Sequence, residues 1–212
     1  MAKVTTITTS DVEPHPCPGG RAHWLAILAN CRAIPRVLFA VILVFGASYS
    51  SAQAQRPTES QVEAAYLYNF GKFVTWPADR ATRAGIFEIC VLGRDPFGEV
   101  LDSTVTGESI DGKKIAVRRL STMQQASSCS ILFVSSSEED RLPTVLETAE
   151  RLSLLTVSNI RRFAERGGDI GLVSQNDRIR FAVNRTAAAK AHLVLSSELL
   201  KVAVKVIGGP GN

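Results

Sequence analysis

Histidine is scarce in this sequence, and its scarcity limits the chemistry available to the protein. The 212 residues contain three histidines, and two of them, His15 and His23, lie in the first 54 residues. His192 is the only histidine after that segment, with no cysteine or histidine at metal-ligand spacing. A Ser-His-Asp triad or a histidine metal site would have to be built around this one residue. The sequence therefore predicts a non-enzymatic protein with no catalytic residue, metal or cofactor.

Two phosphate-binding signatures are also absent. No Gly-x-x-x-x-Gly-Lys-Ser/Thr loop occurs, and residues 93–98, after the first expected strand, have the wrong glycines for Gly-x-Gly-x-x-Gly. The formal net charge is +4, and no block of Lys or Arg after residue 54 is longer than two. Nucleotide binding of those kinds is therefore unsupported, and there is no electrostatic case for nucleic acid.

The amino-terminal segment contains, in order, the three regions of a secretory signal peptide: a basic region, an apolar run and a small-residue cleavage site. Arg21, Arg32 and Arg36 precede an uninterrupted apolar run at residues 37–45, and small and polar residues ending in Ala52-Gln53-Ala54 follow it. The run is too short for a mature membrane span, which takes about 20 residues. We expect a signal peptide with a long n-region over residues 1–54, cleavage after Ala54, and one mature domain over residues 55–212. An uncleaved anchor is the alternative.

Cysteine is as sparse as histidine. Of four cysteines, Cys17 and Cys31 would leave with the signal, so Cys90 and Cys129 remain. An even pair in an exported protein favours a disulfide, and two buried free thiols in adjacent strands are the alternative. A bridge would close a loop of about 40 residues, for which chain entropy gives about 4 kcal/mol as an upper figure.

The clearest helical pattern covers residues 62–77. Six residues recur at steps of three and four and predict one stripe with a single polar interruption: Val62, Tyr66, Asn69, Phe70, Phe73 and Trp76. Two capping-box patterns precede the stripe, Thr58-x-x-Gln61 and Ser60-x-x-Glu63, and Pro77 is expected to end the helix. We expect a core helix, with a partner-binding helix as the alternative.

Strand and helix patterns alternate along the rest of the chain. Apolar strand patterns cover residues 87–92, 129–134 and 154–157, a basic edge-like strand covers 114–120, and helical patterns cover 95–102, 138–151 and 158–164. Residues 169–173 and 178–183 predict an antiparallel hairpin, and 184–207 predicts two helices. The expected fold is a single α/β domain. Its mostly parallel central sheet is flanked by helices and followed by a C-terminal antiparallel hairpin and helices.

Several stretches, taken in order, resemble the YfiR family of periplasmic regulators. They are residues 63–77 (EAAYLYNFGKFVTWP), 89–93 (ICVLG) with 95–98 (DPFG), 129–135 (CSILFVS), 155–158 (LTVS), Phe163-Ala164 with Gly167-Gly168, and 196–200 (SSELL). Each piece alone is weak, but the ordered set is specific and covers most of residues 61–206.

The resemblance implies an exported, periplasmic α/β domain that performs no chemistry. The best-described members bind the periplasmic sensor part of an inner-membrane diguanylate cyclase and hold it inactive, and an outer-membrane lipoprotein relieves the inhibition by sequestering them. The resemblance also implies a homodimer and a disulfide at the positions of Cys90 and Cys129. Some members carry a second pair near the positions of Ala164 and Gly171, where this chain has no cysteine.

We therefore expect a regulator that lowers cyclic di-GMP, and with it biofilm formation, by binding the inactive state of a sensor protein. Asn69, Lys72 and Trp76 are the expected contact residues, because a polar break in an apolar stripe and a helix-end aromatic suit an interface. Core packing is the alternative for Trp76. The alternative function is a periplasmic small-ligand sensor or carrier acting on a membrane histidine kinase. Its pocket would lie at the carboxyl ends of the strands, near residues 93–97 and 135–137.

Overall fold

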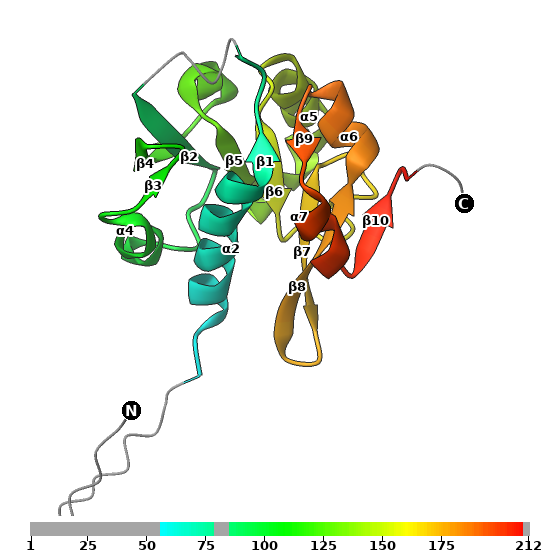
Figure 1. Cartoon of the computed structure of the whole chain (residues 1–212), viewed down its shortest axis with the longest axis horizontal. Coiled ribbons are helices and arrows are strands. Elements are labelled where there is room, and N and C mark those ends of the chain that lie inside the picture. The colour runs from blue at the N-terminus through cyan, green and yellow to red at the C-terminus, as the bar shows by residue number, and fades with distance from the viewer. Residues whose placement is uncertain (1–55, 79–84, 210–212) are drawn as a thin grey trace, which may run out of the picture. The chain divides into compact units, whose positions relative to one another are not determined.

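The first helix of the computed structural model, α2 (Glu59–Phe73), begins where the sequence predicts. The Thr58 hydroxyl accepts a hydrogen bond from the Gln61 N–H at 3.3 Å, and the Gln61 side chain accepts one from the Thr58 N–H at 2.8 Å. This capping box satisfies two N–H groups that the start of a helix leaves without partners. The structure describes residues 56–78 and 85–209 (Figure 1), so the expected signal peptide and its cleavage after Ala54 lie outside the described residues.

Strand pairing, and not Pro77, ends α2. Val74 adopts an extended backbone, and the chain continues as β1 (Val74–Thr75), which pairs antiparallel with β9 (Val194–Leu195). The helix therefore stops at Phe73, short of the end expected from the sequence. A two-residue strand has no sequence pattern of its own, and only its distant partner defines it.

The buried face of α2 also differs from the expected stripe. The face consists of Glu63, Ala64, Leu67, Phe70 and Gly71. Asn69 and Phe73, both members of the expected stripe, are exposed. A side chain at position 71 would collide with Ile110, so small residues set the closest approach of the helix to its neighbours. The expected stripe was therefore right for Phe70, which is buried, and for Tyr66 and Trp76, which pack against the core, and wrong for Phe73. It also omitted the small residues Ala64 and Gly71.

An eight-stranded sheet forms the centre of the domain, in the order β10-β8-β7-β6-β5-β2-β4-β3. The strands are β2 (Ile86–Leu92), β3 (Ser109–Ile110), β4 (Lys113–Leu120), β5 (Ile131–Val134), β6 (Leu155–Ser158), β7 (Ile170–Gln175), β8 (Arg178–Asn184) and β10 (Lys205–Ile207). The pairs β3–β4 and β7–β8 are antiparallel, and the other neighbours are parallel. The expected α/β class with a mostly parallel sheet and an antiparallel hairpin is confirmed.

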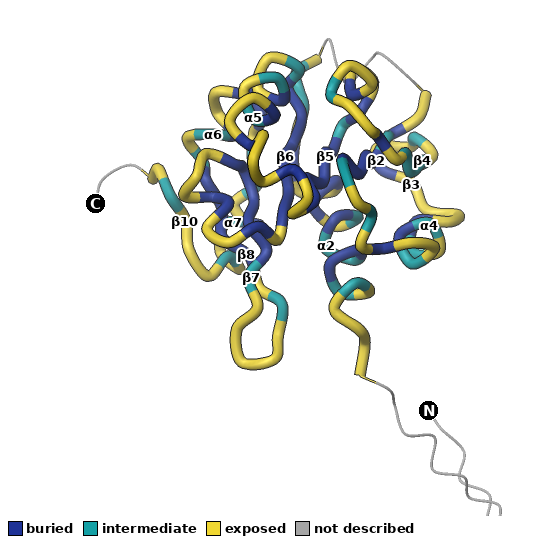
Figure 2. The backbone as a smooth tube through the Cα atoms, turned by 180° about the vertical axis from the view of Figure 1, so that it is seen from behind, coloured by how far each residue is buried: buried dark blue, intermediate teal, exposed yellow. Residues whose placement is uncertain are grey.

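Helices cover both faces of this sheet (Figures 1 and 2). Besides α2, the helical segments are α4 (Glu99–Val105), η1 (Met123–Ser128), η2 (Ser136–Arg141), α5 (Leu142–Arg151), α6 (Arg185–Lys190) and α7 (Ser197–Val202). Residues of α2, α4, α6 and α7 pack into one core cluster, and residues of η1 and α5 pack into the other. Within residues 56–78 and 85–209, no helix has both the length and the apolarity that a membrane crossing requires.

The two cores divide β2 between them in the alternation expected of a strand buried on both faces. Phe87, Ile89 and Val91 belong to the α2 side, and Cys90 and Leu92 belong to the α5 side. The apolar run that predicted this strand is almost continuous because its alternate side chains pack into two different cores.

Two expected helices are absent or shortened. The expected helix over residues 158–164 is absent: Ser158 is the last residue of β6, and residues 160–164 form a bend and turns. The Ser158 hydroxyl accepts from the Ile160 N–H at 3.0 Å, and Arg162 has a left-handed backbone (φ 57°), which a helix does not accommodate. The section expected to be two helices contains α6 and α7 together with β9 and β10. Pairing with β1 and β8 holds these two short strands, so local propensity did not reveal them.

Candidate functional site

The carboxyl-terminal half of α2 presents an exposed side. Asn69, Lys72 and Phe73 are all exposed, and steps of three and four residues place them on the same side of the helix. Phe73 is 40% exposed, so part of an aromatic residue is accessible on this side of the helix. Two of the expected contact residues, Asn69 and Lys72, therefore lie together next to an exposed aromatic ring.

The β1–β9 pair extends this exposed side. The Ser196 N–H donates to the Phe73 carbonyl at 2.9 Å, and Thr75 lies opposite Val194. Strand alternation then places Phe73 and Val194 on the outward face, with Val74 turned into the core. Val194 is 65% exposed. We call Asn69, Lys72, Phe73 and Val194 the α2 surface. Sequence reasoning missed Val194, because its position depends on pairing across 120 residues of chain.

Lys72 is held in place on this surface. Its Nζ lies 3.9 Å from the centre of the Tyr68 ring, a cation–π arrangement that leaves the ammonium group accessible. The Tyr68 hydroxyl in turn donates a hydrogen bond to Glu108, which lies between α4 and β3. The Lys72 side chain is therefore presented at a defined place, with a connection to the neighbouring helix.

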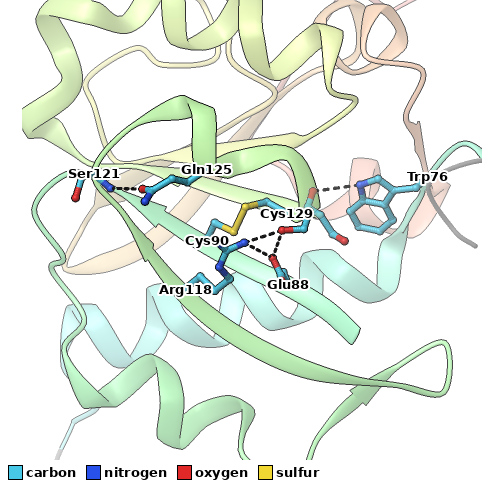
Figure 3. Close-up of a disulfide and its surroundings, with 9 residues drawn as sticks. Trp76, Glu88, Cys90, Arg118, Ser121, Gln125 and Cys129 are labelled. Atoms are coloured by element: carbon cyan, nitrogen blue, oxygen red, sulfur yellow. Dashed lines mark hydrogen bonds and ion pairs between the residues drawn. A yellow bond between two sulfur atoms is a disulfide. The ribbon is translucent and has the colours of Figure 1, made fainter. Parts of the chain in front are cut away.

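Trp76, the third expected contact residue, lies beyond β1 and packs inward. Its ring meets Phe87 edge to face at a centroid distance of 5.2 Å, and its Nε1 donates to the Ser130 carbonyl at 3.2 Å (Figure 3). The side chain is half-buried. These contacts favour the core-packing alternative for the indole, which anchors the end of β1 against β2 and β5.

The disulfide lies close to this anchor (Figure 3). Cys90 and Cys129 are fully buried, bonded to each other, and 5.9 Å apart between Cα atoms. The bridge joins β2 to the residue two positions before β5. The structure thus contains the disulfide that the sequence favoured over two free thiols.

An ionic cluster lies beside the disulfide. Arg118 of β4 pairs with Glu88 at 2.9 Å, and the Ser128 hydroxyl donates to the same carboxylate at 2.6 Å. Glu88 and the two cysteines are the only group of three potential ligands close enough for a metal among the described residues. Because both sulfur atoms are in the disulfide, neither is available as a thiolate ligand.

Two buried carboxyl groups connect the helices and strands. Burial raises the pKa of Glu63 to about 7, although Asn159 donates to its carboxylate at 3.2 Å. Burial also raises the pKa of Asp169 to about 6, against hydrogen bonds from the Thr156 N–H at 2.8 Å and the Thr156 hydroxyl at 2.6 Å. Glu63 thus links α2 to the loop after β6, and Asp169 links β6 to β7.

The carboxyl ends of the strands, where the alternative function needs a pocket, are closely joined. The Arg94 N–H donates to the Ser137 hydroxyl at 2.9 Å, and a side chain at position 93 would collide with Ser137. The two expected loops therefore touch each other. A cavity of about 460 Å³ lies beside them, between Leu92, η1 and α5.

These features define a disulfide-linked α/β domain whose first described helix exposes polar residues beside an aromatic ring. The model of the YfiR/HmsC-like family, DUF4154, matches residues 60–204, and the chain belongs to this family. Proteins of this family are generally regulatory.

No functionally curated protein matches the sequence. Among solved structures, the chain is similar to a conserved domain protein from Vibrio cholerae O1 biovar El Tor, with 12% identity over 56% of this chain and 54% of that chain (TM-score 0.45). It is also similar to the ABC domain from Streptococcus pneumonia in complex with L-Trp, with 11% identity over 68% and 60% (TM-score 0.46). The chain thus spans between half and two thirds of these proteins, and likenesses this weak carry no functional argument.

Proposed function

We propose that this protein is a non-enzymatic periplasmic regulator. It binds the periplasmic sensor part of an inner-membrane signalling protein, in the first instance a diguanylate cyclase, and thereby lowers cyclic di-GMP. The observation that carries the proposal is the α2 surface, which exposes Asn69, Lys72 and Phe73 from within the family's opening signature. An exposed aromatic beside a positioned cation is a composition that suits a protein interface.

The mechanism is a shift of population. The regulator binds the inactive conformation of the sensor more tightly than the active one, so binding itself holds the sensor inactive. A preference of about 100-fold corresponds to about 2.7 kcal/mol, which a few well-placed contacts can supply. No chemical step on the sensor is needed.

Compartment, assembly and release belong to the same proposal. The buried disulfide supports function in an oxidising compartment such as the periplasm. Family membership supports a regulatory protein partner. We propose a homodimer as the working form, and sequestration by an outer-membrane lipoprotein as the route of release.

Lys72→Glu tests the contact surface. We expect it to weaken binding to the periplasmic sensor domain of the host's diguanylate cyclase about fivefold, because an attractive exposed charge becomes repulsive. Thermal stability should change only slightly, since Lys72 is exposed and its ring contact is small. Arg161→Glu is the matched control, because Arg161 is exposed in the turns after β6 and belongs neither to the α2 surface nor to the cavity beside Leu92. Equal loss of binding and stability in Lys72→Glu would contradict the interface assignment.

The second candidate function is a small-ligand sensor or carrier that acts on a membrane histidine kinase. The cavity beside Leu92 favours it, because Glu138, Arg141 and Arg151 place charged groups around a volume of about 460 Å³. Native mass spectrometry of the protein purified from cells tests it. A bound small molecule at one per chain supports this function, and a mass equal to the bare chain contradicts it.

A further inference from the structure

Three exposed valines lie close together near the carboxyl-terminal end of the described chain. Val202 is 63% exposed at the end of α7, and Val204 and Val206 follow it at 48% and 40%. They are half of the large apolar residues exposed within residues 56–78 and 85–209. Clustered exposed apolar residues commonly mark an interaction site. None of these three belongs to the α2 surface, so the cluster needs an explanation of its own.

The valines lie along an open edge of the sheet. β10 is the terminal strand of the sheet and pairs with β8 from Lys205 to Ile207. Within the described part of the chain no strand lies beyond β10, and Figures 1 and 2 show it at the outer side of the molecule. An open strand edge can pair with the backbone of another chain. We call β10 together with Val202 and Val204 the β10 edge.

The charges on β10 do not protect it against such pairing. Edge strands that have to stay single usually carry unpaired charges or proline. β10 contains no proline, and its only charged residue is Lys205, whose Nζ lies 2.7 Å from the Glu165 carboxylate. The hydrogen bond from Lys205 is the main cause that lowers the pKa of Glu165 below its ordinary value. The lysine charge is therefore compensated within the chain, and the rest of the edge is apolar.

This composition fits a second copy of the chain. A twofold-symmetric contact uses the same patch on both subunits, so the patch has to be complementary to itself. Two antiparallel β10 strands centred on Val206 would place Val206 beside its counterpart and Lys205 opposite Ile207, with no like charges directly opposed. The α2 surface suits self-association less well. Its Lys72 contacts a ring and not a carboxylate, so the lysines of two copies would repel each other.

The size of the β10 edge indicates how strong the contact can be. A protein interface of standard size buries about 800 Å² on each partner, and a strand of three residues supplies only part of that area. Val202 and Val204 extend the contact from β10 to the end of α7. We therefore expect a dimer with a dissociation constant in the micromolar range, so that the dimer fraction rises with concentration.

We propose that the β10 edge is the surface through which two copies of this chain form a homodimer, by antiparallel pairing of their β10 strands into one continuous sheet. The inference deepens the proposed function, because it assigns a surface to the homodimer proposed as the working form, and in that respect it rests on that function. The α2 surface is not part of the contact, so each copy keeps it for the sensor.

Cysteine crosslinking of the full protein, as it accumulates in the cell, tests the surface directly. Val206→Cys places one thiol of each copy at the centre of the contact, where facing Cα atoms lie about 4.5–5.5 Å apart, within the range of a disulfide. Mild oxidation should give a covalent dimer on a non-reducing gel, which the wild type does not give. Val194→Cys, on the α2 surface, should remain monomeric. Absence of the Val206→Cys dimer, or a dimer from Val194→Cys alone, would overturn the proposal.

Opposite charges at the same position provide an independent test. Val206→Lys and Val206→Glu should each weaken self-association more than about tenfold, because like charges then face each other across the twofold axis. An equimolar mixture of the two variants should associate again, since lysine then faces glutamate. Ile86→Glu is the matched control, because Ile86 is similarly exposed on β2, and it should leave the dissociation constant within about twofold.

Sedimentation velocity measures these dissociation constants. A wild-type monomer at every concentration up to about 0.1 mM would contradict the proposal, because a micromolar affinity gives mostly dimer there. A mixture that associates no better than either variant alone would contradict it as well. Both assays use the purified protein without a sensor or cyclic di-GMP. Failure of the β10 edge and failure of the regulatory function therefore remain distinguishable.

Discussion

At the residue scale, Glu63 carries the clearest consequence of burial. It is 2% exposed, it faces the core from α2, and its carboxyl accepts a hydrogen bond from Asn159. From the sequence, Glu63 belonged to a second capping box, and nothing local predicted its burial. Its environment depends on Asn159, which lies 96 residues further along the chain.

The raised pKa of Glu63 gives a pH dependence with a definite sign. The folded-state pKa of about 7 lies above the ordinary value of 4.5, so folding favours the protonated form. The stabilisation is complete below the ordinary value and is lost as the pH rises through about 7. Asp169, with a pKa raised to about 6, loses its part in the same direction but at lower pH.

We expect the melting temperature to fall between pH 6.5 and pH 8 in the wild-type protein, and to fall less in Glu63→Gln. Glutamine keeps an acceptor for Asn159 without a charge to bury. Thermal melts at the two pH values, followed by circular dichroism, measure the difference. An identical fall in the variant would show that another group causes the dependence.

At the element scale, the sequence predicted the buried strands correctly, but it did not predict in full which side chains of α2 are exposed. Apolar runs predicted β2, β5 and β6, because strands buried on both faces need apolar residues at every position. The exposed side of α2 was only half predicted: Asn69 and Lys72 were named, whereas Phe73 was assigned to the core and Val194 was not considered. Both errors have the same cause, the pairing of β9 with β1. This pairing ends α2 at Phe73 and places Val194 beside it.

Positions 164 and 171 test how close the turn after β6 lies to β7. A Cβ built on Gly171 would lie 3.6 Å from the Ala164 Cβ, within the usual range for a disulfide. The turn after β6 and the start of β7 are therefore close enough at these two positions for a second bridge.

We expect Ala164→Cys with Gly171→Cys to form a second disulfide under oxidising conditions. Closing a loop of about eight residues is worth about 2.5 kcal/mol at most, and the close Ala164 nitrogen, 3.2 Å from the new Cβ, will reduce the gain. Thiol titration detects the bridge, and melting with and without reductant measures its effect. Either single variant is the control. Two free thiols under oxidising conditions would contradict the placement.

At the scale of the whole molecule, the sequence predicted the fold class but not the order of the strands. Alternating strand and helix patterns are enough for a parallel sheet between helical layers. The placement of β4 outside β2, next to the outermost strand β3, follows from a crossover that no local pattern encodes. The basic residues of β4 did suggest a strand near the edge of the sheet.

The α2 surface is connected to neighbouring elements of the domain. Lys72 lies over the Tyr68 ring, and the Tyr68 hydroxyl donates to Glu108, between α4 and β3. The disulfide and Trp76 brace β2, β5 and the end of β1 behind this region.

The measurement that tests the central claim most directly is the intracellular level of cyclic di-GMP in a strain lacking this protein. We expect a rise relative to wild type that is reversed by re-expressing the wild-type protein or Arg161→Glu, and is not reversed by Lys72→Glu. An unchanged level in the deletion strain would contradict restraint of a diguanylate cyclase. That result would favour a membrane histidine kinase as the partner.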